Sequence, residues 1–245
     1  MNTANCIAIA HRGASTYAPE NTFAAFDLAL EMGARHLELD VQMTSDDHLV
    51  IIHDDWVNRT TNGFGRVWKH TLAELQALDA GAWFHKKFAG ERTPTLEAML
   101  NRYRGRAHLH VEIKGKTEGL SERTADMIRA LGWAGDVTMT SFQKDKLDAL
   151  RAYAPELPAG WLLRKIDDEV ISEAKRLGIA QLCPKADNVT PELVARLRGA
   201  GFNLRAWGVS NEELMRNMID AGVDGMTVNF PDKLIARLRQ TSVNK

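Results

Sequence analysis

The amino-acid sequence predicts an α/β protein built as a (β/α)8 TIM barrel, with a small inserted cap after the second strand. Eight short apolar runs recur along the 245 residues, as expected of parallel strands buried on both faces. Most runs start 21–30 residues apart, which leaves room for one helix between strands. One interval is 72 residues long and marks an insertion. An open doubly wound sheet is the alternative fold.

The strands are expected in eight runs, in chain order 6–11, 36–42, 108–114, 136–142, 157–163, 180–185, 203–209 and 225–230. Helix signals between these runs agree with the barrel. Gly33 ends the first helix, and Thr190 with Pro191 gives an N-cap followed by proline at the first helical position. Ser210 and Glu213 have the spacing of a capping box.

The long interval places an insertion subdomain at about residues 54–92. We expect its six aromatic residues to pack a small core of their own: Trp56, Phe64, Trp68, Trp83, Phe84 and Phe88. Loops after barrel strands open onto the catalytic face, so the insert is expected to cap the site. No linker interrupts the remaining pattern, and residues 1–245 are predicted to form one domain.

The composition argues against two classes of partner. Lys and Arg number 31 against 32 Asp and Glu, so the chain lacks the basic excess typical of nucleic-acid binding. The apolar stretch 6–10 is too short for a signal peptide or a spanning helix, and we expect a cytoplasmic protein without stable membrane insertion. Cys6 and Cys183 lack metal-ligand spacing and are expected to be buried thiols.

Two histidines directly follow strand-like runs, namely His11 and His53. A lone histidine at a strand end is more often structural, so each alone carries modest weight. Residues 41–52 have the pattern of a hairpin, with Ser45 pairing His48. That register would place His53 opposite Asp40, whereas a shift of one residue would turn it away.

Carboxylates alternate along two of the predicted strands. Glu38 and Asp40 are two residues apart and therefore point the same way, as do Glu112 and Lys114 on the third run. Three carboxylates in a partly desolvated barrel repel one another unless a cation joins them, and an all-oxygen set suits Mg²⁺ or Ca²⁺. The alternative is a buried ion pair between Glu112 and Lys114, with Glu38 exposed.

These groups together favour phosphoryl transfer. Two imidazoles can serve as general acid and base, while a metal and the cations of Arg12 and Lys114 stabilise anionic phosphate oxygens.

Several motifs occur in one order along the chain: His11-Arg12-Gly13, Pro19-Glu20-Asn21-Thr22, Glu38-Leu39-Asp40-Val41-Gln42, His53-Asp54, Arg59-Thr60-Thr61-Asn62-Gly63 and Glu112-Ile113-Lys114. With these motifs the sequence resembles the glycerophosphodiester phosphodiesterase family, from residue 7 to about residue 235. The resemblance implies a metal-dependent barrel that hydrolyses small glycerophosphodiesters, the deacylated phospholipid headgroups, to glycerol 3-phosphate and an alcohol.

The resemblance also implies roles at matching positions: His11 and His53 as the acid/base pair; Glu38, Asp40 and Glu112 as ligands of one divalent cation, Mg²⁺ or Ca²⁺; Arg12 and Lys114 as phosphate contacts; and Trp207 against the glycerol moiety. For Trp207, packing within the barrel is an equal alternative. The sequence leaves open the headgroup alcohol, the histidine that acts as base and the oligomeric state.

Three positions depart from the family pattern. His110 stands where the family usually has Asn, Asn229 replaces Asp near the end of the last strand, and Gly208 replaces Thr beside Trp207. None belongs to the acid/base or metal set, so we expect effects on substrate preference.

Two alternative functions remain. A lysophospholipase D-like enzyme would use the same barrel and need an apolar rim, for which Trp83, Phe84 and Phe88 are the candidates. A non-catalytic phosphodiester-binding barrel would not need the intact histidines and carboxylates.

Overall fold

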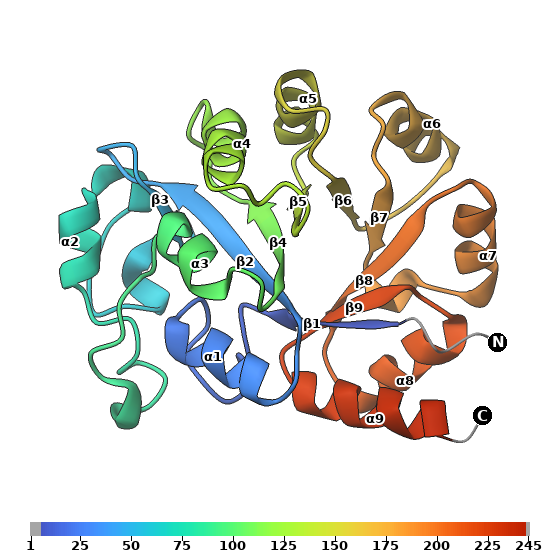
Figure 1. The fold of residues 1–245 in the computed structure, drawn as a ribbon, viewed down its shortest axis with the longest axis horizontal. Helices are drawn as coiled ribbons and strands as arrows, with labels where there is room; N and C mark the ends of the chain where they lie inside the picture. The colour runs from blue at the N-terminus through green and yellow to red at the C-terminus, as the bar shows by residue number, and fades with distance from the viewer. Residues whose placement is uncertain (1–5, 244–245) are drawn as a thin grey trace.

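Eight parallel strands form a closed barrel at the centre of the structure, a computed structural model that describes residues 6–243, with side chains up to residue 240 (Figure 1). The barrel strands are β1 (Ile7–His11), β2 (His36–Met43), β4 (His108–Ile113), β5 (Val137–Ser141), β6 (Ala159–Leu163), β7 (Gln181–Pro184), β8 (Asn203–Val209) and β9 (Gly225–Val228). Each overlaps one of the predicted runs, so the predicted strand order is confirmed.

The first strand closes the barrel. β1 pairs in parallel with β2, where His11 lies opposite Glu38, and with β9, where Ala10 lies opposite Val228. An open sheet would leave two separate edges. The doubly wound alternative is therefore wrong.

Helices surround the barrel on its outside (Figure 1). They are α1 (Phe23–Glu31), α2 (Leu72–Ala77), α3 (Leu96–Tyr103), α4 (Leu120–Ala130), α5 (Lys144–Tyr153), α6 (Asp168–Arg176), α7 (Pro191–Gly199), α8 (Glu212–Ala221) and α9 (Pro231–Val243), with short 3₁₀ turns η2 (Val57–Arg59), η3 (Val67–Lys69), η4 (Lys86–Phe88) and η5 (Ala186–Asn188). Most follow a strand and return the chain to the start of the next one.

The helix signals are correct at α7 and wrong by one residue at α8. Thr190 accepts a hydrogen bond from the backbone of Leu193, and Pro191 is the first residue of α7. In α8, Asn211 and not Ser210 is the N-cap, because its side chain accepts from the backbone N of Leu214 at 2.8 Å. Asn is as good an N-cap as Ser, and the predicted capping box does not form.

The hairpin after β2 forms, but its predicted register is wrong. β3 (Leu49–Ile51) pairs antiparallel with β2, with Val41 opposite Ile51 and Met43 opposite Leu49. The turn has one residue more than expected, since Asp47 adopts a left-handed conformation with φ of 65°. Asp40 consequently lies opposite Ile52, whose N donates to the Asp40 carbonyl.

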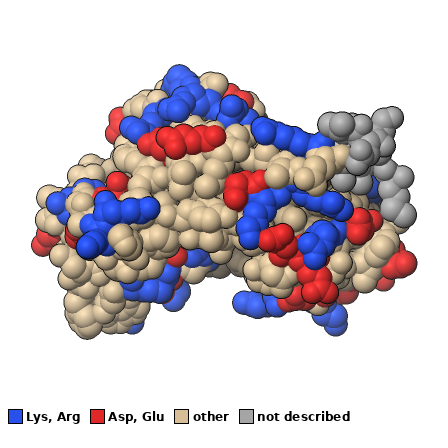
Figure 2. Space-filling view, turned by 90° about the horizontal axis from the view of Figure 1, so that it is seen from below, with Lys and Arg blue, Asp and Glu red and all other residues tan. Residues whose placement is uncertain are grey.

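The insert follows this hairpin and has a small core, although not the expected aromatic one. Its hydrophobic core is aliphatic and joins Val57, Val67 and Leu75 of the insert to Val50 and Ile52 of the hairpin. Three of its aromatics are exposed instead, with Phe64 at 76% and both Trp56 and Trp83 at about 40%. Figure 2 shows the lobe that the insert forms, at the left, where uncharged side chains cover much of the lower part.

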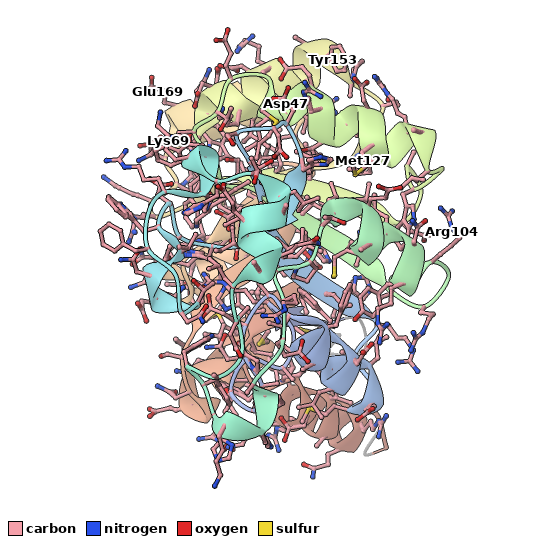
Figure 3. All side chains as sticks on the ribbon, turned by 90° about the vertical axis from the view of Figure 1, so that its left-hand side faces the viewer. Asp47, Lys69, Arg104, Met127, Tyr153 and Glu169 are labelled. Carbon is pink, nitrogen blue, oxygen red and sulfur yellow. The ribbon has the colours of Figure 1, made fainter. Side chains whose placement is uncertain are left out.

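The two ends of the barrel can be told apart in Figure 3. Arg104, which follows α3 and precedes β4, lies on the right, at the end where the strands begin. Glu169, near the start of α6 and after β6, lies on the left with Lys69, at the end where the strands finish. The candidate site lies at this second end.

Both cysteines are free thiols, with Cys183 buried and Cys6 partly buried. Within residues 6–243, no helix combines the length and the apolar character that crossing a bilayer requires.

Candidate active site

A cavity of about 460 Å³ opens at the C-terminal ends of the barrel strands. This volume is within the usual range for small-molecule sites. Seven of the eight residues expected at the site line it: His11, Arg12, Glu38, His53, Glu112, Lys114 and Trp207. The eighth, Asp40, is fully buried beside them. The structure therefore brings the whole predicted set together.

Three carboxylates converge beneath the cavity. One oxygen each of Glu38, Asp40 and Glu112 lies within 4.8 Å of the other two, and all three side chains are buried. Glu112 also accepts a hydrogen bond from Nζ of Lys114 at 2.9 Å, so the ion pair of the alternative interpretation forms beside the carboxylate cluster. The alternative arrangement with Glu38 exposed is wrong, because only 2% of Glu38 is accessible.

The pKa values of Glu38 and Asp40 shift in opposite directions, because the two buried carboxylates have different charged neighbours. Burial, together with the charges of Asp40 and Glu112, raises the pKa of Glu38 well above its usual value. Burial would also raise the pKa of Asp40, but the charge of Arg12 leads the opposing effects and the pKa falls to about 2. Such mutual repulsion is expected of carboxylates that share a site.

Arg12 connects the carboxylates to the loop after β1. Its Nε lies 2.9 Å from Oδ2 of Asp40, and its Nη1 donates to Oε1 of Glu20 at 2.8 Å. Its backbone is left-handed, with φ of 55°, and its backbone N donates to the Glu38 carboxylate at 3.1 Å. Asn21 donates to Asp40 from the same loop at 2.8 Å.

The two histidines face the cavity with different partners. Nδ1 of His11 lies 2.6 Å from Oδ1 of Asn229, whereas Nδ1 of His53 lies 2.5 Å from Oδ1 of Asp54. Burial and then the charge of Arg12 lower the pKa of His11 to about 4. Burial also lowers the pKa of His53. Both rings therefore favour the neutral form, which can accept a proton.

His53 reaches the cavity although the register that predicted it was wrong. The strand β3 ends at Ile51, so the alternation of side chains stops before His53. The side chain of Gln42 donates to the carbonyls of Ile52, His53 and Asp54, which holds this turn in place.

A network of polar side chains beside His53 and Arg12 was not predicted from the sequence patterns. Arg59 of η2 donates from Nε to Asp54 at 2.6 Å and from Nη1 and Nη2 to Glu20 at 2.8 Å. Glu20 in turn accepts from Arg12. These residues occur within the family motifs, but they lie on loops, where hydrophobic periodicity carries no signal.

The insert contributes to the site through Asp54, which contacts His53, and through Arg59, which binds Asp54. Among the described residues, none from 54–92 lines the cavity, and His53 lies just before that segment. Figure 1 shows the insert beside the barrel, next to β2 and β3.

Aromatic and basic residues form the opposite wall. The rings of Trp207 and Phe142 meet edge to face at 4.9 Å, and the indole N of Trp207 donates to the carbonyl of Leu163. The guanidinium of Arg164 lies 5.6 Å from the Trp207 ring centroid. Gly208 has φ of 74°, a conformation that would strain the Thr usual in the family.

The arrangement can hold a phosphodiester. Imidazoles on the rim can exchange protons, the cations can bind anionic oxygens, and the aromatic wall can accept an apolar face of a ligand.

Comparisons with known proteins agree with this chemistry. The family model described as the glycerophosphoryl diester phosphodiesterase family matches residues 11–233. The glycerophosphodiester phosphodiesterase of Caldanaerobacter subterraneus subsp. tengcongensis is 41% identical over 238 residues, covering 96% of this chain and 98% of that protein.

Two solved structures are similar in fold. That of glycerophosphodiester phosphodiesterase from Agrobacterium tumefaciens is 32% identical, with a TM-score of 0.85 and coverage of 94% of this chain and 99% of that chain. An Oleispira antarctica phosphodiesterase, in complex with the product sn-glycerol-3-phosphate, is 31% identical, with a TM-score of 0.86 and coverage of 97% and 96%.

Proposed function

This chain belongs to the glycerophosphoryl diester phosphodiesterase family, and we propose that the cavity at the C-terminal end of its barrel is the site of its reaction. The protein is a hydrolase that converts glycerophosphodiesters to glycerol 3-phosphate and an alcohol. The main support for this site is that His11, His53 and the buried carboxylates converge at one cavity.

One divalent cation, Mg²⁺ or Ca²⁺, would be held by Glu38, Asp40 and Glu112. Their oxygens lie close enough to share an ion. Among the described residues, Oδ1 of Asp40 is buried without a hydrogen-bond partner, which leaves a ligand position unused. Oxygen donors of this kind suit a hard cation. When bound, the ion supplies a Lewis acid that stabilises negative charge on the phosphate oxygens.

His11 and His53 would act as the acid/base pair. The glycerol moiety carries a hydroxyl beside its phosphorylated carbon. One ring, in its neutral form, takes the proton of that hydroxyl as its oxygen attacks phosphorus. The other ring enters the step protonated, having taken a proton from solvent, and gives it to the departing alcohol oxygen. The product of this step is a cyclic glycerol phosphate, which water opens with the two proton transfers reversed. Tethering of the nucleophile lowers the entropic cost of attack.

The remaining lining residues would position the substrate. Arg12 and Lys114 face the cavity and would contact phosphate oxygens. Trp207 would lie against the glycerol carbons, supported by its edge-to-face contact with Phe142.

The proposed domain is the whole chain 1–245, with an insertion subdomain at about 54–92 whose aliphatic core is continuous with the hairpin. We also propose a cytoplasmic location, supported by two thiols that are not joined in a disulfide.

A coupled assay for glycerol 3-phosphate tests the function. Glycerophosphocholine, -ethanolamine, -glycerol and -inositol would each be offered with Mg²⁺ or Ca²⁺. Release from at least one is expected, and no release from any would contradict the proposal. Lysophospholipase D action would instead leave lysophosphatidic acid and release the headgroup alcohol. A lysophospholipid assayed for release of its headgroup alcohol therefore tests that alternative, which the exposed Trp83 favours.

A further inference from the structure

A second cluster of ligating side chains lies at the opposite end of the same two strands. β2 presents His36 before Glu38, and β4 presents His108 and His110 before Glu112. Side chains two residues apart on a strand share a face, so these histidines point into the barrel below the carboxylates. In the sheet, His36 lies opposite His108. The cluster therefore sits at the N-terminal end of the barrel, away from the phosphodiesterase cavity.

The three rings approach one another as metal ligands do. One ring nitrogen from each histidine lies within 4.8 Å of the other two. Nδ1 of His36 is 3.2 Å from Nε2 of His110. Two imidazole nitrogens bound tetrahedrally to Zn²⁺ at about 2.0–2.1 Å stand roughly 3.3 Å apart. The separation of this pair thus matches that of two bound nitrogens, and a nitrogen of the third ring lies within 4.8 Å of both other rings' ligand atoms.

His110 is buried, and its two ring nitrogens have different surroundings, since Nε2 is the one that faces Nδ1 of His36. Only 4% of His110 is accessible, and among the described residues its Nδ1 is buried with no hydrogen-bond partner. His108, by contrast, is oriented by a 2.9 Å hydrogen bond between its Nε2 and Oγ1 of Thr138. Such outer contacts are typical of histidines that bind metals.

We propose that His36, His108 and His110 form a second metal site, which takes a borderline-soft divalent cation such as Zn²⁺. Imidazole ligands favour Zn²⁺, Co²⁺ and Ni²⁺, whereas the oxygen set of Glu38, Asp40 and Glu112 favours Mg²⁺ or Ca²⁺. One barrel would therefore hold two different ions at its two ends.

The surroundings allow the ion to enter and to complete its coordination. His36 and His108 are only half-buried, so a water molecule can occupy a fourth position. The buried Arg205 lies near His110, and its charge opposes a cation there.

Calorimetric titration with Zn²⁺ tests the site independently of catalysis. The full-length Glu38→Gln/Glu112→Gln chain, which lacks two proposed ligands at the other end, should still bind one Zn²⁺. When His36→Gln or His108→Gln is added to this variant, its affinity for Zn²⁺ should fall. The expected loss is larger than the roughly 10- to 100-fold seen when a residue that only supports a metal ligand is removed. His48→Gln is the matched control, because His48 lies exposed in the hairpin turn. It should leave Zn²⁺ binding unchanged.

Cobalt supplies a readout that needs no histidine variant. Co²⁺ added to the same Glu38→Gln/Glu112→Gln chain should give the intense visible absorption of a tetrahedral nitrogen-ligated ion. Failure to bind Zn²⁺, an octahedral Co²⁺ spectrum, or binding that survives His36→Gln and His108→Gln would each overturn the proposal. In those cases the rings form a hydrogen-bonded stack only. Loss of phosphodiesterase activity does not enter this test, so the two proposals fail separately.

Discussion

Asp54 holds His53 by a contact of 2.5 Å between its Oδ1 and Nδ1 of the ring. A carboxylate at Nδ1 accepts the proton there and leaves Nε2 as the atom that can act in the cavity. We expect Asp54→Ala to lower kcat, by less than the loss of His53 itself, because the ring loses its orientation but not its chemistry. Steady-state kinetics would measure this.

Asp55→Ala is the matched control for Asp54. Asp55 pairs with the exposed Lys116, whereas the carboxylate that pairs with His53 is that of Asp54. An Asp54 variant as active as the Asp55 variant would show that the contact has no catalytic role.

His11→Ala and His53→Ala are each expected to lower kcat by about 10²- to 10⁴-fold, with little change in metal affinity. A substrate with an activated leaving group should rescue loss of the acid but not loss of the base. The comparison of the two variants on that substrate therefore assigns the two roles.

A deoxy substrate analogue tests internal attack. Without the hydroxyl beside the phosphorylated carbon, no cyclic product can form, and turnover should be lost in the unmodified enzyme. Normal turnover of the analogue would leave direct attack by water as the mechanism.

Metal dependence follows from the convergence of Glu38, Asp40 and Glu112. Chelation should abolish turnover, and added Mg²⁺ or Ca²⁺ should restore it. Glu38→Gln or Glu112→Gln should lose metal affinity while the fold stays intact, because each also relieves carboxylate repulsion. Elemental analysis would show whether the protein is free of metal. Full activity of the metal-free protein would exclude this ligand set.

Arg59 is expected to account for part of the effect of the insert. Its side chain is 44% exposed, and an ion pair of that exposure contributes up to about 1 kcal/mol of free energy. Arg59→Ala should therefore lower kcat/KM by up to about fivefold. Replacing residues 57–90 by a short loop should leave a folded barrel with poorer catalysis.

Circular dichroism would confirm that the shortened barrel is folded before its kinetics are compared with those of Arg59→Ala. A folded, shortened chain with full kcat/KM would refute a role of the insert in the site.

Gly13→Ala should destabilise the fold by at least about 2 kcal/mol. Gly13 has φ of 84°, and a Cβ atom there would lie 2.5 Å from the backbone carbon of Ala25. Gly105→Ala is the control, since φ is 67° but no atom lies within 4 Å, so only the backbone strain of about 1 kcal/mol is added. Urea denaturation would measure both, and equal losses would exclude the steric argument.

The barrel strands could be predicted because strands buried on both faces leave an unbroken apolar run. The carboxylate cluster could be predicted too, since a period of two places Glu38 and Asp40 on one face. The register of the hairpin could not, because it depended on whether Asp47 adopts a left-handed conformation. His53 reached the cavity only because strand geometry ends before it.

Tertiary contacts decided what local patterns could not. The aromatics of the insert were expected inside, yet the cation of Arg66 lies over the rings of Trp56 and Trp68 near the surface. The pairing of Arg59 with Glu20 joins loops 39 residues apart, and no periodicity predicts it. Asn211 displaced Ser210 because both can cap a helix.

Barrel closure has a consequence for the time at which activity appears during synthesis. His11 is held by Asn229, 218 residues later, and β1 pairs with β9. At about 5–20 residues per second, a ribosome needs roughly 10 to 40 s to make the chain between them. From the synthesis of Glu112 until that of Asn229, the nascent chain has its carboxylates and both histidines but an unsupported His11. Recovery of turnover during refolding should therefore report the docking of the last strand, a late event in a fold with such distant contacts.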